Sequence, residues 1–164
     1  MARVHSLSVA PLVLLLASCG SDPVDVAGTY SISLTNRENG CMTDGWTEGA
    51  TSTGVPLVVT QEGATFTAEV TGATAIALNV YPGDETFTGT ISGTHLDGLL
   101  RGRAMSQGSC AYTVNIELDG DLDGDVLTGE LRWYADVNDS PDCEPFAGCS
   151  NRQVFNGTRP PTTD

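Results

Sequence analysis

The feature that most constrains the fold is a glycine-centred pattern that occurs three times. Gly63, Gly93 and Gly124 each lie between two runs in which apolar and polar or small residues alternate, and they are spaced about 30 residues apart. After each glycine the chain continues with the same alternation, which reads Phe66-x-Ala68-x-Val70 in the first copy. Tight hairpin turns commonly need a residue with positive φ, which glycine adopts without steric cost. The pattern therefore predicts three β-hairpins.

Alternation with a period of two continues through most of the chain beyond residue 27, and no stretch has a convincing helical period. The expected strands are 28–35, 57–61, 65–71, 86–92, 95–104, 110–122, 126–135 and 153–159. Eight sequentially joined antiparallel strands predict an all-β fold, an antiparallel up-and-down eight-stranded barrel, because closure removes the exposed edges. A two-sheet β-sandwich is the alternative. The segment 75–80 is either a ninth strand or part of a long loop.

The start of the chain has a different pattern. Arg3 and His5 precede an apolar run at 7–16, which ends in Leu16-Ala17-Ser18-Cys19. A basic start, a short apolar segment and small residues are typical of a secretory signal, and the run is too short to span a bilayer. The ending resembles the lipobox of bacterial lipoprotein precursors, which implies cleavage before Cys19 and lipidation of its thiol. An ordinary signal peptide with an incidental cysteine is the alternative.

These patterns divide the chain into four expected parts. They are a lipoprotein signal peptide (1–18), the lipidated Cys19 with a polar tether (19–26), a single β-barrel domain (27–160) and a C-terminal tail (161–164). In the lipoproteins that the lipobox resembles, Asp directly after the cysteine retains the protein at the inner membrane. Here Gly20 follows, so we expect a lipid anchor in the outer membrane of a bacterial cell envelope.

The remaining four cysteines are Cys41, Cys110, Cys143 and Cys149. An even number in an exported chain is typical of two disulfides, and the spacing lacks the close pairs of a four-cysteine zinc site. The expected order of the strands in the barrel favours disulfides between Cys110 and Cys143, whose strands pair, and between Cys41 and Cys149, because the first and last strands meet at closure. The pairing of Cys143 with Cys149, which closes the shortest loop, is the alternative.

The charge balance is strongly acidic, with 21 Asp and Glu against 7 Lys and Arg and a net charge of −14. Nucleic acids are bound through cationic neutralisation of their phosphates, so the composition argues against a nucleic-acid partner. An acidic surface serves solubility more often than it marks a specific partner.

The two ends of the expected barrel differ. The three glycine turns share the end where the tether enters, whereas the long connections 36–56, 72–85, 105–109 and 136–152 and the four cysteines fall at the far end. Long loops on a rigid scaffold are common binding sites, so Trp46, Tyr81 and Phe146 are the candidate contact residues. Alternatively, these side chains only cap the core.

Five small residues fall at inward positions in the middle of strands: Ala68, Gly89, Gly98, Gly129 and Gly157. Glycine inside a strand marks sharp curvature or a close approach of another backbone. Small side chains in a barrel interior would also leave room for a ligand. Both interpretations are open at this point.

Residues 119–130 match the spacing of a calcium-binding loop, D-x-D-x-D-G-x₅-E. An EF-hand needs flanking helices, however, and here strands flank the loop, with Gly124 already explained as a hairpin glycine. If the turn binds calcium, Asp121, Asp123 and Asp125 are the expected ligands. No other cofactor is expected.

Catalytic motifs are lacking. The expected barrel domain holds one histidine, His95, beside a turn, and the sequence contains no G-x-S-x-G, H-E-x-x-H or phosphate-binding loop. We therefore expect a protein that is not an enzyme.

The residues Val26-Ala27-Gly28-Thr29-Tyr30 are similar to the Gly-x-Trp start of the first strand in calycin barrels, the lipocalins and avidins, with Tyr30 in place of Trp. Because calycin barrels bind small molecules inside, the resemblance implies binding of a small apolar or amphiphilic ligand at the barrel mouth. The alternative is a protein-interaction or envelope-structural module that uses the distal loops.

Overall fold

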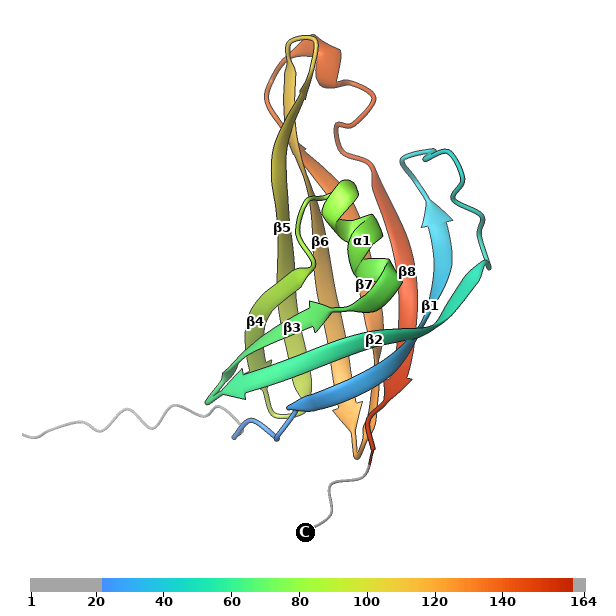
Figure 1. Ribbon diagram of the computed structural model, residues 1–164. Helices are drawn as coiled ribbons and strands as arrows, with labels where there is room; N and C mark the ends of the chain where they lie inside the picture. Colours follow the sequence, from blue (N-terminus) through green and yellow to red (C-terminus); the bar gives the residue numbers. More distant parts are fainter. Residues whose placement is uncertain (1–21, 161–164) are drawn as a thin grey trace, which may run out of the picture.

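The computed structural model describes residues 22–160, which form a closed antiparallel barrel of eight strands, each paired with its neighbours in sequence (Figure 1). The predicted up-and-down barrel is confirmed, and the sandwich alternative is wrong. The proposed signal peptide, the lipobox with Cys19 and the tail 161–164 lie outside the described residues. The strands are β1 (Gly28–Asn39), β2 (Thr51–Glu62), β3 (Thr65–Val70), β4 (Thr86–Ser92), β5 (His95–Gln107), β6 (Cys110–Asp123), β7 (Val126–Val137) and β8 (Ser150–Thr158).

Alternation places one face of each strand in the core. On β3, Phe66, Ala68 and Val70 are buried, whereas the three intervening polar residues are exposed. β8 closes the barrel by pairing with β1 from Ser31 opposite Thr158 to Asn39 opposite Asn151.

The hairpin glycines form the turns that the sequence predicts. Gly63, Gly93 and Gly124 have φ of 59°, 62° and 59°. A fourth turn of this kind at Gly108 (φ 61°) joins β5 to β6 and was not predicted. The expected connection 105–109 is therefore too long, because β5 continues to Gln107 beyond an irregularity in its pairing between Arg101 and Ala104. As a result, the β5–β6 hairpin stands above the rest of the barrel (Figure 1).

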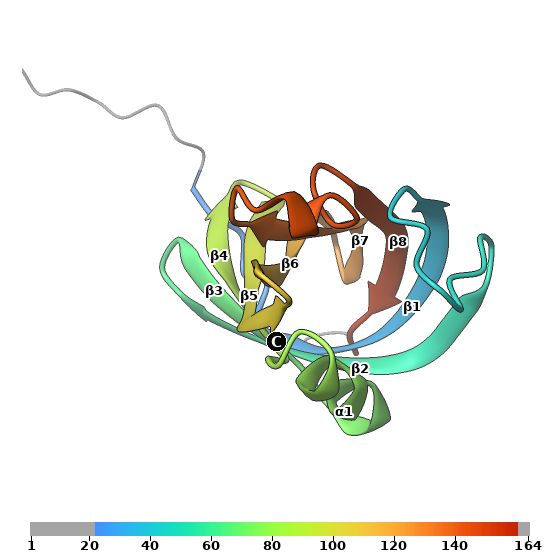
Figure 2. The ribbon, with the colours of Figure 1, turned by 90° about the horizontal axis from the view of Figure 1, so that it is seen from above.

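One helix interrupts the strands. Residues Gly72–Val80 form α1, so neither a ninth strand nor an irregular loop is correct for 75–80. Its three alanines favour a helical conformation. At the end of the helix, Nη2 of Arg103 donates a hydrogen bond of 3.1 Å to the carbonyl oxygen of Val80, which would otherwise lack a partner within the helix. Seen from above, α1 lies at the rim beside β2 (Figure 2). Within residues 22–160 no helix has the length and apolar character needed to span a bilayer.

The end of the barrel where the chain enters is closed by residues 24–26. The backbone N–H of Val24 donates to the carbonyl oxygen of Gly93, and Gln61 bonds both the carbonyl of Val24 and the N–H of Val26. Val26 is 1% exposed and belongs to the core cluster. The segment expected to be a polar tether therefore packs against the barrel from Val24 onward.

The space beside two of the inward glycines, Gly98 and Gly129, is occupied by aromatic rings. A Cβ on Gly98 would lie 2.9 Å from the Phe66 ring, and a Cβ on Gly129 would lie 2.6 Å from the Phe155 ring. The glycines therefore allow close approach of these rings and of neighbouring backbone. This part of the barrel is filled.

Candidate functional site

Above the filled region, a cavity of about 380 Å³ extends from the core to the far end of the barrel. Its lining includes Ile116, Leu118 and Phe155, which are buried, and also Asp44 and Tyr81, which are exposed. The cavity therefore opens to solvent at the end opposite the glycine turns. This volume lies near the lower end of the roughly 300–1,000 Å³ range typical of small-molecule sites.

The sequence creates this space by changing the size of the inward residues along the strands. Near the filled region the strands contribute large side chains such as Phe87 and Leu131. Toward the mouth, the lining positions of β1, β2 and α1 are Asn36, Ser52 and Ala77, which are too small or too polar to fill the centre. The cavity thus has an apolar body and a more polar mouth.

Three polar side chains are linked across the cavity wall. Nε1 of Trp133 on β7 donates to Oε1 of Gln153 on β8, and Nε2 of Gln153 donates to Oδ1 of Asn36 on β1, both at 2.8 Å. Nδ2 of Asn36 donates no hydrogen bond among the described residues, so it is free to donate to a bound molecule. The sequence analysis did not identify these three hydrogen-bonded side chains, although polar residues at inward positions of the strand alternation could have indicated them.

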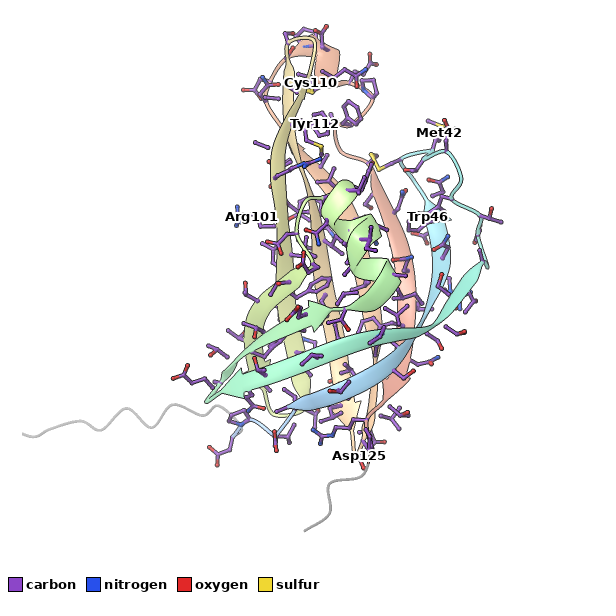
Figure 3. The ribbon with its side chains drawn as sticks, viewed as in Figure 1. Met42, Trp46, Arg101, Cys110, Tyr112 and Asp125 are labelled. Carbon is purple, nitrogen blue, oxygen red and sulfur yellow. A yellow bond between two sulfur atoms is a disulfide. The ribbon has the colours of Figure 1, made fainter. Side chains whose placement is uncertain are left out.

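Trp46 reaches the cavity from the β1–β2 loop (Figure 3). Its Nε1 donates a 3.1 Å hydrogen bond to the carbonyl oxygen of Arg37, which fixes the indole relative to the end of β1. The start of the loop is tied down as well: the side chain of Asn151, only 5% exposed, donates to Oγ1 of Thr43 and accepts from the backbone N–H of Cys41. The loop therefore has fixed attachments to the barrel.

The structure brings two of the three predicted contact residues together. Trp46 and Tyr81 both line the cavity, but Phe146 does not. Phe146 instead stacks on Tyr112 near the tip of the β5–β6 hairpin, with ring centroids 4.6 Å apart and an interplanar angle of 14°. Figure 3 shows Tyr112 and Cys110 at that tip, away from Trp46. Phe146 therefore packs as part of a separate cluster.

Two disulfides hold the far end. They join Cys41 to Cys149 and Cys110 to Cys143, with S–S distances of 2.11 and 2.00 Å, which is the pairing that the strand order favours. The alternative pairing of Cys143 with Cys149 is wrong. The first bridge links the β1–β2 loop to the start of β8, so it stabilises the loop that carries Trp46.

The acidic turn lies at the opposite end of the barrel (Figure 3). Asp121 faces His95 at 3.5 Å, and Asp125 forms a 3.0 Å ion pair with Arg159. Asp123 is exposed beside Gly124. In residues 22–160, no group of three or more His, Cys, Asp or Glu side chains is placed to hold a metal ion, so the structure does not bring the three expected calcium ligands together.

Arg152, adjacent in sequence to the cavity-lining Gln153, is engaged outside the cavity. Arg152, on the outer side of β8, forms ion pairs with Glu130 and with Glu38, the latter at 3.1 Å. These hydrogen bonds raise the pKa of the guanidinium above its ordinary value. Arg152 therefore joins β7, β8 and β1 on the outside of the barrel and does not line the cavity.

Comparisons with protein-family models, with curated proteins and with solved structures found no match.

Proposed function

We propose that this protein binds, without catalysis, a small apolar or amphiphilic ligand in the cavity at the barrel mouth. The observation that supports this proposal best is the combination of a mostly apolar cavity with a few hydrogen-bonding groups near its opening, which is the usual composition of small-molecule sites. The hydrogen-bonded chain through Trp133, Gln153 and Asn36 orients those groups before a ligand arrives. Groups that are already ordered reduce the entropic cost of binding.

The resemblance of Leu16–Cys19 to a lipobox adds a proposed location, the outer membrane of a bacterial envelope, with Cys19 as the lipid anchor. Val24 is attached at the closed end of the barrel, through its N–H bond to Gly93. An anchor preceding Val24 would place the closed end toward the membrane. The cavity would then open away from the membrane, toward its ligand.

The two tryptophans of the chain allow a direct test, because Trp46 and Trp133 both line the cavity. Decanol, titrated into the purified domain, is expected to change the tryptophan fluorescence with saturation at one molecule per chain. Ala77→Phe adds a ring to a cavity-lining position of α1 and should weaken decanol binding at least about ten-fold, because it occupies the apolar volume.

Ile76→Phe is the matched control, because Ile76 belongs to the same helix but is 67% exposed and does not line the cavity. It should leave decanol affinity within about two-fold of the parent. Equal affinities of Ala77→Phe and Ile76→Phe for decanol, with both variants folded by circular dichroism, would place binding outside the cavity.

A second candidate function is protein interaction through the distal loops and α1. It is favoured by apolar side chains that face solvent at this end, namely Met42 (85% exposed), Ile76 (67%) and Val80 (69%). Cross-linking in intact cells through these positions should then capture a partner protein. Capture only through the closed end would contradict that function.

A further inference from the structure

The cavity lining carries negative charge and no positive charge. Of the residues that line it, Asp44 alone carries a formal charge near neutral pH, and the lining contains no arginine, lysine or histidine. An anionic head group would therefore enter the cavity without a cation to pair with it. Asp44 repels a like charge at the mouth, and any loss of water around the unpaired head group adds a further cost, so the lining disfavours carboxylate and phosphate amphiphiles.

No arginine lines the cavity, and two of those near this end are engaged outside it. Arg152 is held on the outer surface between Glu38 and Glu130, and Arg103 donates to the helix end at Val80. The chain as a whole has a net charge of −14, which adds a long-range field that repels anions. Local and overall charge therefore act in the same direction.

The mouth also presents two aromatic side chains with the carboxylate. Asp44 and Trp46 are separated by one glycine on the β1–β2 loop, and Tyr81 contributes to the lining from the end of α1. Aromatic faces attract ammonium groups through their quadrupole, and a neighbouring carboxylate adds ordinary charge attraction. All three groups are at the open end, where a head group would remain partly solvated, whereas Leu118 and Phe155 are at the apolar end.

We propose that the cavity selects cationic amphiphiles, with an alkylammonium head group at Asp44, Trp46 and Tyr81 and the apolar chain directed toward Leu118 and Phe155. This inference rests on the proposed ligand-binding function. A neutral alcohol of the same chain length binds more weakly, through the apolar body and the amide of Asn36. The corresponding carboxylate binds weakest.

The experiment compares decyltrimethylammonium, decanol and decanoate, each below its aggregation concentration, by tryptophan fluorescence and native mass spectrometry. We expect decyltrimethylammonium to bind at least about ten-fold more tightly than decanoate, from one partly exposed ion pair plus contacts with two aromatic faces. Asp44→Asn should lower the affinity for decyltrimethylammonium about three-fold, a larger loss than for decanol, which carries no charge.

Glu48→Gln is the matched control, since it removes one negative charge from the same loop at an exposed residue that does not line the cavity. A three-fold loss in Asp44→Asn but not in Glu48→Gln supports the assigned head-group site. Equal losses in both variants would overturn it in favour of bulk charge attraction.

The three probes also separate failure of this inference from failure of the proposed function. If decanol binds in the cavity but decyltrimethylammonium binds no more tightly than decanoate, the charge selectivity is wrong and the ligand-binding function stands. If none of the three probes binds, the ligand-binding function is contradicted, and the selectivity with it.

Discussion

The two ends of this barrel are stabilised in different ways. At the closed end, three glycine turns, the packed segment at 24–26 and the ring of Phe66 pack closely together. At the open end, longer connections are held by two disulfides and a few side-chain hydrogen bonds around a cavity of about 380 Å³. Close packing stabilises one end, and covalent links allow the other to remain partly empty.

This difference has a consequence for where a binding site can exist. Filling the open end with side chains would add apolar burial but would remove the cavity, whereas cross-links constrain the loops without occupying space. The loss of a cross-link should therefore affect both stability and binding, and a change in the packed end should affect stability alone.

The largest expected effect comes from removing the bridge between Cys41 and Cys149. In the chain-entropy model, a loop with a sequence separation of 108 contributes about 5 kcal/mol to the free energy of unfolding. The double variant Cys41→Ala/Cys149→Ala should lose stability of that order, as measured by urea unfolding. It should also weaken decanol binding, because the loop with Trp46 loses its covalent link to β8 and keeps only hydrogen bonds.

Removing the bridge between Cys110 and Cys143, with a separation of 33, should cost less, about 3.5 kcal/mol. Because this bridge holds the β5–β6 tip and not the cavity loop, decanol affinity should change little. A larger loss of binding in Cys110→Ala/Cys143→Ala than in the Cys41/Cys149 variant would contradict the assignment of the two bridges.

The next largest effect is expected from substitutions of glycines in the packed interior of the barrel. A Cβ on Gly129 would collide with the backbone carbonyl oxygen of Asp119 as well as with the Phe155 ring, whereas a Cβ on Gly98 would meet chiefly the end of the Phe66 ring. Gly129→Ala should therefore lower the free energy of unfolding by about 3 kcal/mol, and Gly98→Ala by about 1 kcal/mol.

A second substitution separates ring contact from backbone contact. Phe66→Leu removes the end of the ring that Gly98→Ala would touch, so its cost in the double variant should be less than the sum of the two single costs. Phe155→Leu cannot relieve Gly129→Ala, because the carbonyl of Asp119 remains. Equal relief in both pairs would show that backbone contact does not dominate at Gly129.

The contrast between the ends also explains what could be predicted from the sequence. At the closed end, turn geometry, alternation and small inward residues are local properties, so Gly63, Gly93 and Gly124 identified the hairpins and the barrel order. The disulfide pairing followed from that order. The turns and the alternation each depend on a few residues that are close in the sequence, so they can be recognised without the structure.

The open end depends on contacts between distant segments. The apolar residues of α1 lie on both of its faces, because Ile76 and Val80 face solvent while Leu78 is buried. The end of the helix is fixed by Arg103 from β5. The same holds for Asn36, Gln153 and Trp133, which meet from three strands. Phe146 is expected at the mouth from its residue type and its place in a long far-end connection, but its stacking on Tyr112 depends on the length of the β5–β6 hairpin, which the sequence did not predict.

A smaller effect is expected at Tyr30, which joins the packed segment to the closed end. Its hydroxyl donates a 2.9 Å hydrogen bond to the carbonyl of Val26, and burial raises the pKa of the phenol above its ordinary value of 10.0, with Arg159 partly opposing the rise. Tyr30→Phe removes the bond and should cost about 1–2 kcal/mol near pH 8, measured by urea unfolding.

The pH dependence gives this prediction a second readout. A pKa that is higher in the folded chain means that the neutral phenol contributes stability below about pH 10 and that this contribution is lost as the pH rises through the folded value. Tyr30→Phe lacks this loss, so the stability difference between parent and variant should narrow above about pH 10. A difference that stays constant to about pH 11 would contradict burial of the phenol.

The smallest effect concerns the tip of the β5–β6 hairpin, where Asp142 receives hydrogen bonds from the backbone N–H and the hydroxyl of Ser109, at 2.9 and 2.7 Å. Both bonds lower the pKa of the Asp142 carboxyl below its ordinary 3.8, the backbone bond more than the hydroxyl. The carboxylate therefore stabilises the tip above about pH 4, and this contribution is lost as the pH falls through the folded pKa. Ser109→Ala removes only the hydroxyl, so carbon-13 NMR titration should show the pKa of Asp142 rising part of the way toward 3.8. A complete return of the pKa to 3.8 would show that the backbone N–H of Ser109, in the turn at Gly108, does not itself hold the carboxylate. Side-chain contacts rather than backbone geometry would then order this tip, as they order the cavity loop.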